Sequence, residues 1–209
     1  MYGLIPPASN LQPRFNICPT TTIDTVVSSD GQRKLVPMRW GLIPSWWNKP
    51  LKEMKLTTFN ARAETVTEKP IFRSAFRQSR CLIPASGFYE WRNTPEGKQP
   101  HYFTRRDGEL MTLAGLWDEW TDRTTGEKVK SCCMVITEPN ELVAGVHDRM
   151  PVILEPKDFQ QWEHGQPNDV VGLMKPAADN VLRKWLVSPR VNSSRTSDED
   201  ATLIEAIAA

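Results

Sequence analysis

The sequence predicts a single α+β domain made mostly of short antiparallel strands, with a few short helices at the periphery. The 209 residues contain no evident linker, so one domain is favoured over two small ones. The 17 prolines interrupt helix interiors and central strands alike, which favours short elements. Segments rich in Val, Ile, Phe, Tyr and Thr alternate with turn signals, as they do in antiparallel hairpins.

The strands are expected at seven places: residues 35–40, 57–65, 80–91, 101–105, 110–120, 129–137 and 151–154. Turn signals at residues 93–97 and 122–126 join neighbouring strands as hairpins. Helices are expected over residues 71–78 and 157–162, because each follows a proline suited to a helix start. A third helix is expected over residues 180–186, where Asp179 can cap its start. The polar tail, residues 193–209, is expected to be loose.

The cysteines and histidines form no metal-binding pattern. Cys18, Cys81, Cys132 and Cys133 show no CxxC spacing and the three histidines are far apart, so neither a metal nor a cofactor is expected. The thiols should be reduced and packed as small hydrophobes. The N-terminus has no basic start followed by an apolar run, and no stretch approaches membrane-spanning length. A soluble, cytoplasmic protein without membrane contact is therefore expected.

The charge is distributed unevenly along the chain, although the formal net charge is only +1. Residues 33–106 hold 15 Lys or Arg and 5 Asp or Glu, a balance of +10, whereas the remainder has a balance of −9. Such a block suits a polyanion-binding face, because Lys and Arg neutralise phosphates and release counterions. An ordinary solvated surface with uneven charge is the alternative.

Within this basic block, Trp46 and Trp47 lie between Pro44 and Pro50, which predicts an irregular loop. Aromatic rings beside Lys and Arg bind single-stranded nucleic acid, since bases stack on the rings and the cations hold the backbone. The alternative is a packed Trp pair that pins the loop to the core.

Three short clusters place polar groups in apolar or strand-like surroundings: NARAET (60–65), GFYEW (87–91) and HDRMP (147–151). An ionisable group among large apolar residues is costly to bury unless it is paired or used. We therefore expect one polar site assembled from distant parts of the chain.

Seven segments together resemble the SOS response-associated peptidase (SRAP) family: PRFNICPT (13–20), WGLIPSWW (40–47), NARAET (60–65), CLIPASGFYEW (81–91), AGLW (114–117), HDRMP (147–151) and VSPRVN (187–192). They occur in the family's order over nearly the whole chain. The resemblance implies a strand-rich domain with a barrel-like core that binds single-stranded DNA and crosslinks to abasic sites. It also implies a monomer, located at the nucleoid when bound to DNA. The family's peptidase activity is the removal of its own initiator Met, which exposes a cysteine from position two as the nucleophile.

The resemblance gives the clusters catalytic roles that their chemistry supports. Glu90, between two aromatic residues, would have its pKa raised by burial and serve as a general acid or base. His147 would move a proton near neutral pH during sugar ring opening, and Asn60 would hold the amine or the sugar through its amide. The alternatives are a buried Glu90–Arg pair, a His147 bonded to Asp148, and a turn role for Asn60.

Further positions follow from the same resemblance. Arg62 lies two residues after Asn60 and would share its strand face, where it can grip a phosphate; Arg149 would do the same. For both arginines the alternative is an ordinary ion pair. Three more residues match family positions that line the pocket: Asn16, Pro19 and Thr137.

The chain departs from the family at position two, which is Tyr2 instead of cysteine. Either the cysteine is replaced, which leaves a binder without thiol chemistry, or a short upstream segment carrying it precedes Met1. We favour the second, because family members place more chain before the NxxPT stretch. Two rival functions stay open: a non-catalytic binding module for single-stranded or modified nucleic acid, and a thiol peptidase that uses Cys81 or Cys132 with His147.

Overall fold

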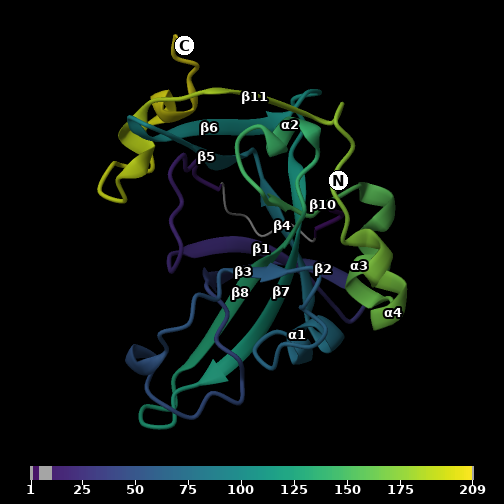
Figure 1. The fold of residues 1–209 in the computed structure, drawn as a ribbon. Coiled ribbons are helices and arrows are strands. Elements are labelled where there is room, and N and C mark those ends of the chain that lie inside the picture. Colours follow the sequence, from purple (N-terminus) through teal and green to yellow (C-terminus); the bar gives the residue numbers. More distant parts are fainter. Residues whose placement is uncertain (1, 5–10, 209) are drawn as a thin grey trace.

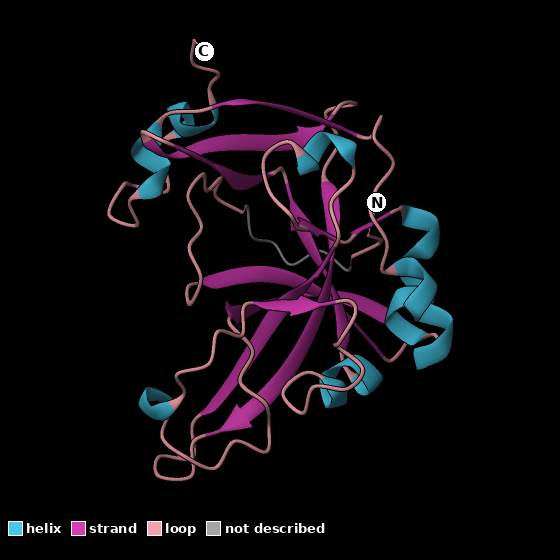
Figure 2. Ribbon diagram, viewed as in Figure 1, coloured by secondary structure: helices cyan, strands magenta, loops and turns pink. Residues whose placement is uncertain are grey.

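The computed structural model describes residues 2–4 and 11–208, and its strands form two sheets (Figure 1). Strands dominate the fold and the helices lie at its periphery (Figure 2). The larger sheet contains β1 (Thr22–Ser29), β2 (Gln32–Trp40), β3 (Asn60–Arg62), β4 (Arg80–Ala85), β7 (Met111–Thr121), β8 (Lys128–Thr137), β9 (Met150–Pro151) and β10 (Ile153–Leu154). The smaller sheet contains β5 (Phe88–Thr94), β6 (Gly97–Arg105) and β11 (Leu182–Leu186).

The larger sheet closes on itself as a five-stranded barrel. Its strands pair in the order β7-β4-β1-β2-β8, and β8 pairs again with β7. The β2–β8 pair is parallel, and the other four pairs of the ring are antiparallel. Beyond its contacts with β2 and β7, β8 pairs with β3 and β9 through its last residues. The predicted α+β fold with mostly antiparallel strands and a barrel-like core is confirmed.

Short helices lie outside the two sheets: α1 (Arg73–Gln78), α2 (Glu141–Ala144), α3 (Phe159–His164) and α4 (Pro167–Val170). Single 3-10 turns occur at η1 (Leu51–Glu53), η2 (Pro156–Asp158), η3 (Val171–Leu173), η4 (Pro189–Asn192) and η5 (Ala201–Ile204). The fully buried Trp162 joins α3 to the barrel, because its indole N–H donates to the Cys81 carbonyl at 3.0 Å. The Arg80 guanidinium donates to the carbonyls of Phe76, Trp162 and Gly165, and so ties α1 and α3 to the start of β4.

Most predicted strands are present, with two kinds of correction. The expected strand 80–91 is two strands in different sheets, which separate at Ser86-Gly87. Gly87 is required there, since a Cβ would lie 2.2 Å from the Tyr102 ring. The expected strand 57–65 is limited to Asn60–Arg62, and turns follow it. The expected strand 151–154 is divided between β9 and β10, which pair with different strands.

The expected helix 180–186 is wrong: residues Leu182–Leu186 form β11 and pair with β6. Strand β1 was not predicted, although Asp30-Gly31 after it is a strong hairpin signal, with φ of 54° and 73°. The helices over 71–78 and 157–162 are present as α1 and as η2 followed by α3.

The tail expected to be loose packs against the outer face of the smaller sheet (Figure 1). Leu203 is fully buried, and the Trp185 indole N–H donates to the Ile204 carbonyl at 2.8 Å. The Phe15 amide donates to the Asp198 carbonyl. The described part of the tail, residues 193–208, therefore completes a third apolar cluster that also contains Tyr102, Val187 and Val191.

A buried ion pair between Arg33 in β2 and Glu163 in α3 yields a stability prediction. The Glu163 side chain is 1% exposed, and its Oε2 lies 2.6 Å from Arg33 Nη2. R33M should lower the free energy of unfolding by about 3–5 kcal/mol, because it leaves a buried carboxylate unpaired. Urea denaturation measures this change.

The exposed neighbour offers a matched control, since K34M should change stability little. The double variant R33M/E163L should recover most of the loss, because neither charge then remains. A loss from R33M no larger than that from K34M would contradict the prediction.

Candidate functional site

Glu90 is directed toward the interior side of the smaller sheet by strand alternation. Its neighbours Tyr89 and Trp91 pack on the outer face, in the apolar cluster with the tail. Successive side chains of a strand point to opposite faces, so Glu90 shares the inner face with Phe88. Phe88 stacks on Phe103 there, with ring centroids 5.0 Å apart. The carboxyl group of Glu90 thus faces inward, among apolar side chains.

His147 reaches Glu90 from the turn after α2. Asn140 caps α2 by accepting from the Val143 amide at 3.0 Å, and the His147 amide donates to the Val143 carbonyl at 2.9 Å. The Arg149 amide donates to His147 Nδ1 at 3.1 Å, and the Arg149 carbonyl oxygen lies 3.3 Å from the same ring nitrogen. Nδ1 lies 3.6 Å from Glu90 Oε2. The structure thus places two of the three predicted catalytic residues close together, and their catalytic role stays a prediction.

The pKa of Glu90 is raised to about 7, chiefly because burial disfavours the charged carboxylate. His147 opposes this shift and Asp148 adds to it. A carboxyl group that is part protonated at neutral pH can give or take a proton, as acid–base catalysis requires.

Asn60 and Arg62 share one face of β3, while Ala61 between them is fully buried. Strand β3 lies parallel to the end of β8, which also pairs with β9 directly after the HDRMP turn. The Arg149 guanidinium binds the Glu64 carboxylate and so joins this turn to the segment after β3. The alternative of an ion pair for Arg149 is thus realised, whereas the exposed Arg62 forms no ion pair with described residues.

Asn60 has an unusual side chain, because its Oδ1 is buried yet accepts no hydrogen bond within the described residues. A buried acceptor without a donor carries a desolvation cost. No hydrogen bond joins Asn60 to Glu90 or His147 in that part of the chain, so the three predicted catalytic residues are brought together only in part.

The expected pocket-lining residues form no hydrogen bond with Glu90 or His147 in the described part of the chain. The Asn16 amide donates to the Ser193 carbonyl at 3.1 Å, and Pro19 is half-buried in the same segment. Thr137 is buried in β8 and donates to the Met174 carbonyl at 3.3 Å. Their contacts within the described chain leave the pocket role a proposal.

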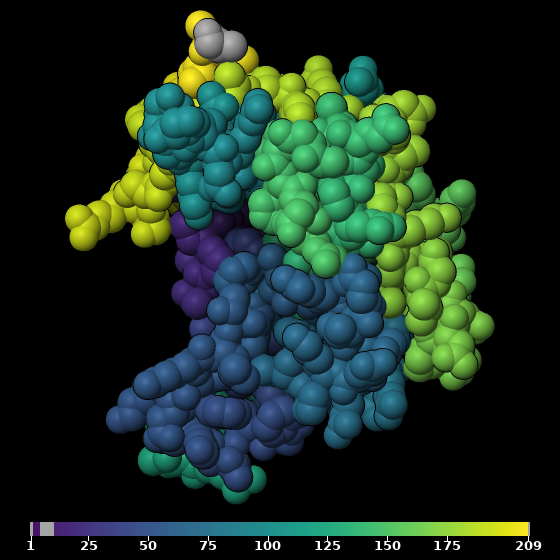
Figure 3. All heavy atoms as spheres, in the orientation of Figure 1, coloured from purple at the N-terminus to yellow at the C-terminus, as the bar shows by residue number. Residues whose placement is uncertain are grey.

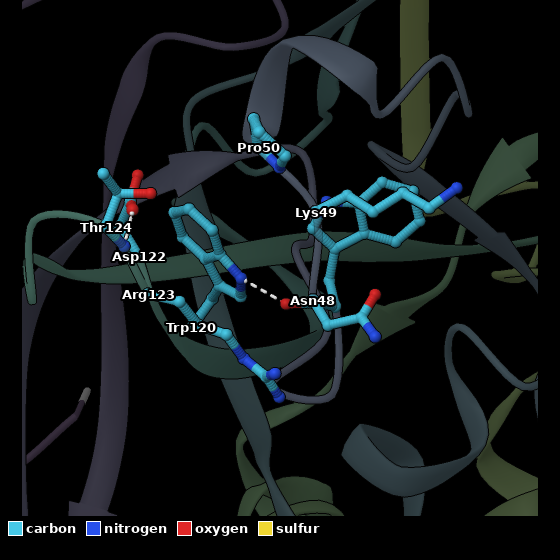
Figure 4. A pocket seen from close by; sticks show the side chains of 8 residues that line it. Asn48, Lys49, Pro50, Trp120, Asp122, Arg123 and Thr124 are labelled. Atoms are coloured by element: carbon cyan, nitrogen blue, oxygen red, sulfur yellow. Dashed lines mark hydrogen bonds between the residues drawn. The ribbon is translucent and has the colours of Figure 1, made fainter.

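Trp46 and Trp47 lie on the irregular loop that the sequence predicts. Trp46 is 50% exposed and Trp47 is half-buried, with ring centroids 6.3 Å apart. The Trp120 indole N–H donates to the Trp47 carbonyl at 2.7 Å (Figure 4). The Ser45 amide donates to the Asp118 carboxylate at 2.8 Å. Two contacts with β7 thus hold the loop while Trp46 faces solvent.

Two further polar residues near Glu90 were not found from the sequence. His101 lies directly opposite Glu90 in the β5–β6 hairpin, and burial lowers its pKa. Lys184 in β11 donates to the Leu142 carbonyl at 2.8 Å and holds α2 against the sheet. The register of the β5–β6 hairpin could have predicted that His101 lies opposite Glu90. The position of Lys184 could not be predicted, because its strand was expected to be a helix.

A thiol nucleophile among the buried cysteines is excluded. Cys81, Cys132 and Cys133 are fully buried, and burial raises the pKa of each thiol, to about 12 for Cys132. A neutral, inaccessible thiol is a poor nucleophile. The thiol peptidase hypothesis with Cys81 or Cys132 is therefore wrong.

Two other classes of feature are absent from the described residues. No group of three or more His, Cys, Asp or Glu side chains is arranged to hold a metal ion. No helix among these residues has the length and apolar character needed to cross a membrane.

Known proteins are similar to this chain in both sequence and fold. A family model described as SOS response associated peptidase (SRAP) matches residues 4–194. The abasic site processing protein YoqW of Bacillus subtilis is 34% identical over 198 residues, which cover 93% of this chain and 87% of the relative. The abasic site processing protein HMCES of Xenopus tropicalis is 32% identical over 89% of this chain and 64% of its own. A solved structure from Bacteroides thetaiotaomicron has a TM-score of 0.83 at 27% identity, over 90% of this chain and 82% of that one.

The raised pKa of Glu90 predicts how stability depends on pH. The pKa is 4.5 for an ordinary Glu and about 7 in the fold, so the folded state binds the additional proton. The resulting stabilisation is fully present below pH 4.5 and is lost as the pH rises through about 7. E90Q cannot titrate. Its stability relative to the wild type should therefore rise by roughly 2–3 kcal/mol between about pH 4 and 8.

Urea denaturation at both pH values measures this difference. E96Q, at an exposed turn position, serves as the control and should show no such rise. A stability difference between E90Q and the wild type that does not change with pH would refute the raised pKa.

Proposed function

This chain belongs to the SOS response-associated peptidase family, and we propose that it binds abasic sites in single-stranded DNA, as a monomer, and processes them at the Glu90–His147 pair. The observation that carries this proposal is the 3.6 Å approach of His147 Nδ1 to a Glu90 carboxyl whose pKa is raised to about 7. Relatives named abasic site processing proteins match most of this chain. Their names indicate the class of substrate.

The chemistry of an abasic site fits these two residues. In its open-ring form the sugar exposes an aldehyde, which condenses with a primary amine to a carbinolamine and then, with loss of water, to an imine. Ring opening requires a proton on the ring oxygen and loss of one from the anomeric hydroxyl. Glu90 in its protonated form would donate the proton that lets hydroxide leave as water, and His147 would accept or return protons beside it.

The DNA-binding surface that we propose is cationic and part aromatic. Four exposed cations that form no ion pair with described residues lie on or after the Trp46 loop and in the NARAET segment: Lys49, Lys52, Lys55 and Arg62. Figure 3 shows a hollow at the left, between the blue segment that contains this loop and the teal and yellow segments above it. We propose that a single strand follows these cations with a base stacked on Trp46.

A non-catalytic binding module is the second candidate, because the contacts of Tyr2 involve other residues than the Glu90–His147 pair. Tyr2 stacks on Phe159 at 5.5 Å, and its hydroxyl hydrogen-bonds to Thr112 at 2.6 Å. Within the described contacts it meets neither Glu90 nor His147. A thiazolidine requires an amine and a thiol on one N-terminal residue, so Tyr2 cannot form one. Under this reading the polar clusters serve recognition alone.

We predict salt-dependent binding that favours single strands. An oligothymidine with one tetrahydrofuran abasic analogue should bind more tightly than blunt duplex, and the affinity should fall steeply with salt. W46A should weaken binding by about 1–3 kcal/mol, because one stacking interaction is lost. Fluorescence anisotropy at several salt concentrations measures both effects.

Thermal melting checks that W46A remains folded. L56A, which truncates another exposed apolar side chain in the same segment, is the matched control and should bind like the wild type. Equal affinity for duplex, or no dependence on salt, would argue against a single-strand surface.

We also predict that a stable crosslink depends on an N-terminal cysteine. A chain extended upstream to begin with Met-Cys-Gly should give a heat-stable adduct with abasic single-stranded DNA, whereas the present chain should give at most an imine that borohydride traps. In the extended chain, E90Q should slow adduct formation more than it weakens DNA binding, because it keeps the shape and removes proton transfer. Denaturing gels report the adduct.

The outcomes distinguish the two candidates. A heat-stable adduct from the present chain would refute the requirement for an N-terminal cysteine. If the extended chain binds abasic DNA but forms no adduct, the binding-module reading is favoured.

A further inference from the structure

A groove lies between Trp46 and the exposed face of α1. It has a volume of about 460 Å³ and is lined by Trp46, Pro70, Arg73, Ser74, Arg77 and Gln78. This volume falls within the roughly 300–1,000 Å³ typical of small-molecule sites. The lining contains one aromatic ring and two cations but no acidic residue.

Helix α1 presents its two arginines to solvent because its apolar residues face the barrel. Ala75 and Phe76 are buried, whereas Arg73 and Arg77 are exposed. Residues four apart in a helix lie on one face, about 5–6 Å apart at Cβ. Both guanidinium groups therefore project along the same side of the groove.

These two arginines have no structural partner among the described residues, since neither forms an ion pair there. Nearby Arg80 is different, because its guanidinium donates to four backbone carbonyls and holds α1 and α3 in place. Arg80 is thus a structural residue, while Arg73 and Arg77 remain available to an anion.

Trp46 completes the groove from a loop whose backbone is fixed. The Asp118 carboxylate accepts from the Ser45 amide before Trp46, and the Trp120 indole donates to the Trp47 carbonyl after it. An exposed ring on a held loop stacks on a base with little loss of conformational entropy.

We propose that this groove binds the nucleotides of single-stranded DNA that flank the abasic position. Trp46 stacks on a base, and Arg73 and Arg77 hold backbone phosphates on the opposite wall. Single-stranded DNA fits better than duplex, because stacked and paired bases would hide the faces that the ring needs. The inference rests on the proposed function and adds a second contact region to it, on α1.

The test compares two lengths of DNA with the wild-type chain and the R73A/R77A variant. The probes are oligothymidines of about 4 and about 12 nucleotides, each with a central tetrahydrofuran analogue, and only the longer one can extend into the groove. R73A/R77A should bind the longer probe about tenfold more weakly, with a salt slope shallower by about 1.4, since each lost phosphate contact removes about 0.7. Its affinity for the shorter probe should be unchanged.

Two controls separate this effect from a general change of charge or fold. K34A/K157A removes the same charge near α3, at positions outside the proposed binding surface, and should leave the difference between probes intact. W46Y should retain most of the affinity that W46A loses for the longer probe, because a smaller ring still stacks. Thermal melting of each variant confirms that it is folded.

The results distinguish a failure of this inference from a failure of the proposed function. If the wild type binds both probes and R73A/R77A binds the longer one equally well with the same salt slope, the groove has no role and the proposed function stands. Equal losses for both probes would also overturn the groove, since the arginines would then act elsewhere. If the wild type binds neither probe, the proposed function fails and the inference fails with it.

Discussion

Strand β8 is the element on which the arrangement of this molecule depends, because it closes the barrel and also carries the strands of the site. Its first residues pair with β2 and β7 and complete the ring, and its last residues pair with β3 and β9. The NARAET and HDRMP clusters are 85 residues apart at Glu64 and Arg149, yet these two side chains form an ion pair. Backbone pairing along β8 therefore brings the NARAET and HDRMP segments close together, independently of their side-chain contacts.

The second constraint is the cost of burying Glu90. Apolar residues on both sides fix the direction of its side chain, and the turn after α2 covers it with His147. Burial raises the pKa, and the fold tolerates this cost because the carboxyl can stay protonated near neutral pH. The side chains of Lys184 and Asn140 form hydrogen bonds with the backbone of α2, so contacts outside the pair set the approach of Glu90 and His147.

The sequence predicted the parts of the fold that follow from local patterns and missed those set by tertiary pairing. Alternating residues and clear turns identified β6, β7 and β8, and Pro70 and Pro156 preceded the predicted helices. The sequence of β11, Leu-Arg-Lys-Trp-Leu, also suits a helix, and only its pairing with β6 makes it a strand. The approach of Glu90 to His147 was predicted from polar residues in apolar surroundings. The contacts of Asn16 and Thr137 with backbone carbonyls depend on packing that no local pattern encodes.

In the folded chain, some cations of the basic block of residues 33–106 bind other parts of the protein and others do not. This distinction says more about DNA binding than the total charge of the block. Arg33 and Arg105 form ion pairs, and Arg80 binds backbone carbonyls, so these arginines hold elements together. Among the cations without such partners in the described residues, Lys49, Lys52 and Lys55 lie on the loop after Trp46, and Arg73 and Arg77 lie on α1 beside the groove. A cation held by an internal acceptor contributes little to binding a polyanion, because its charge is already compensated. The sequence therefore indicates the sign of the surface, and the hydrogen bonds of the structure indicate which charges a DNA strand can use.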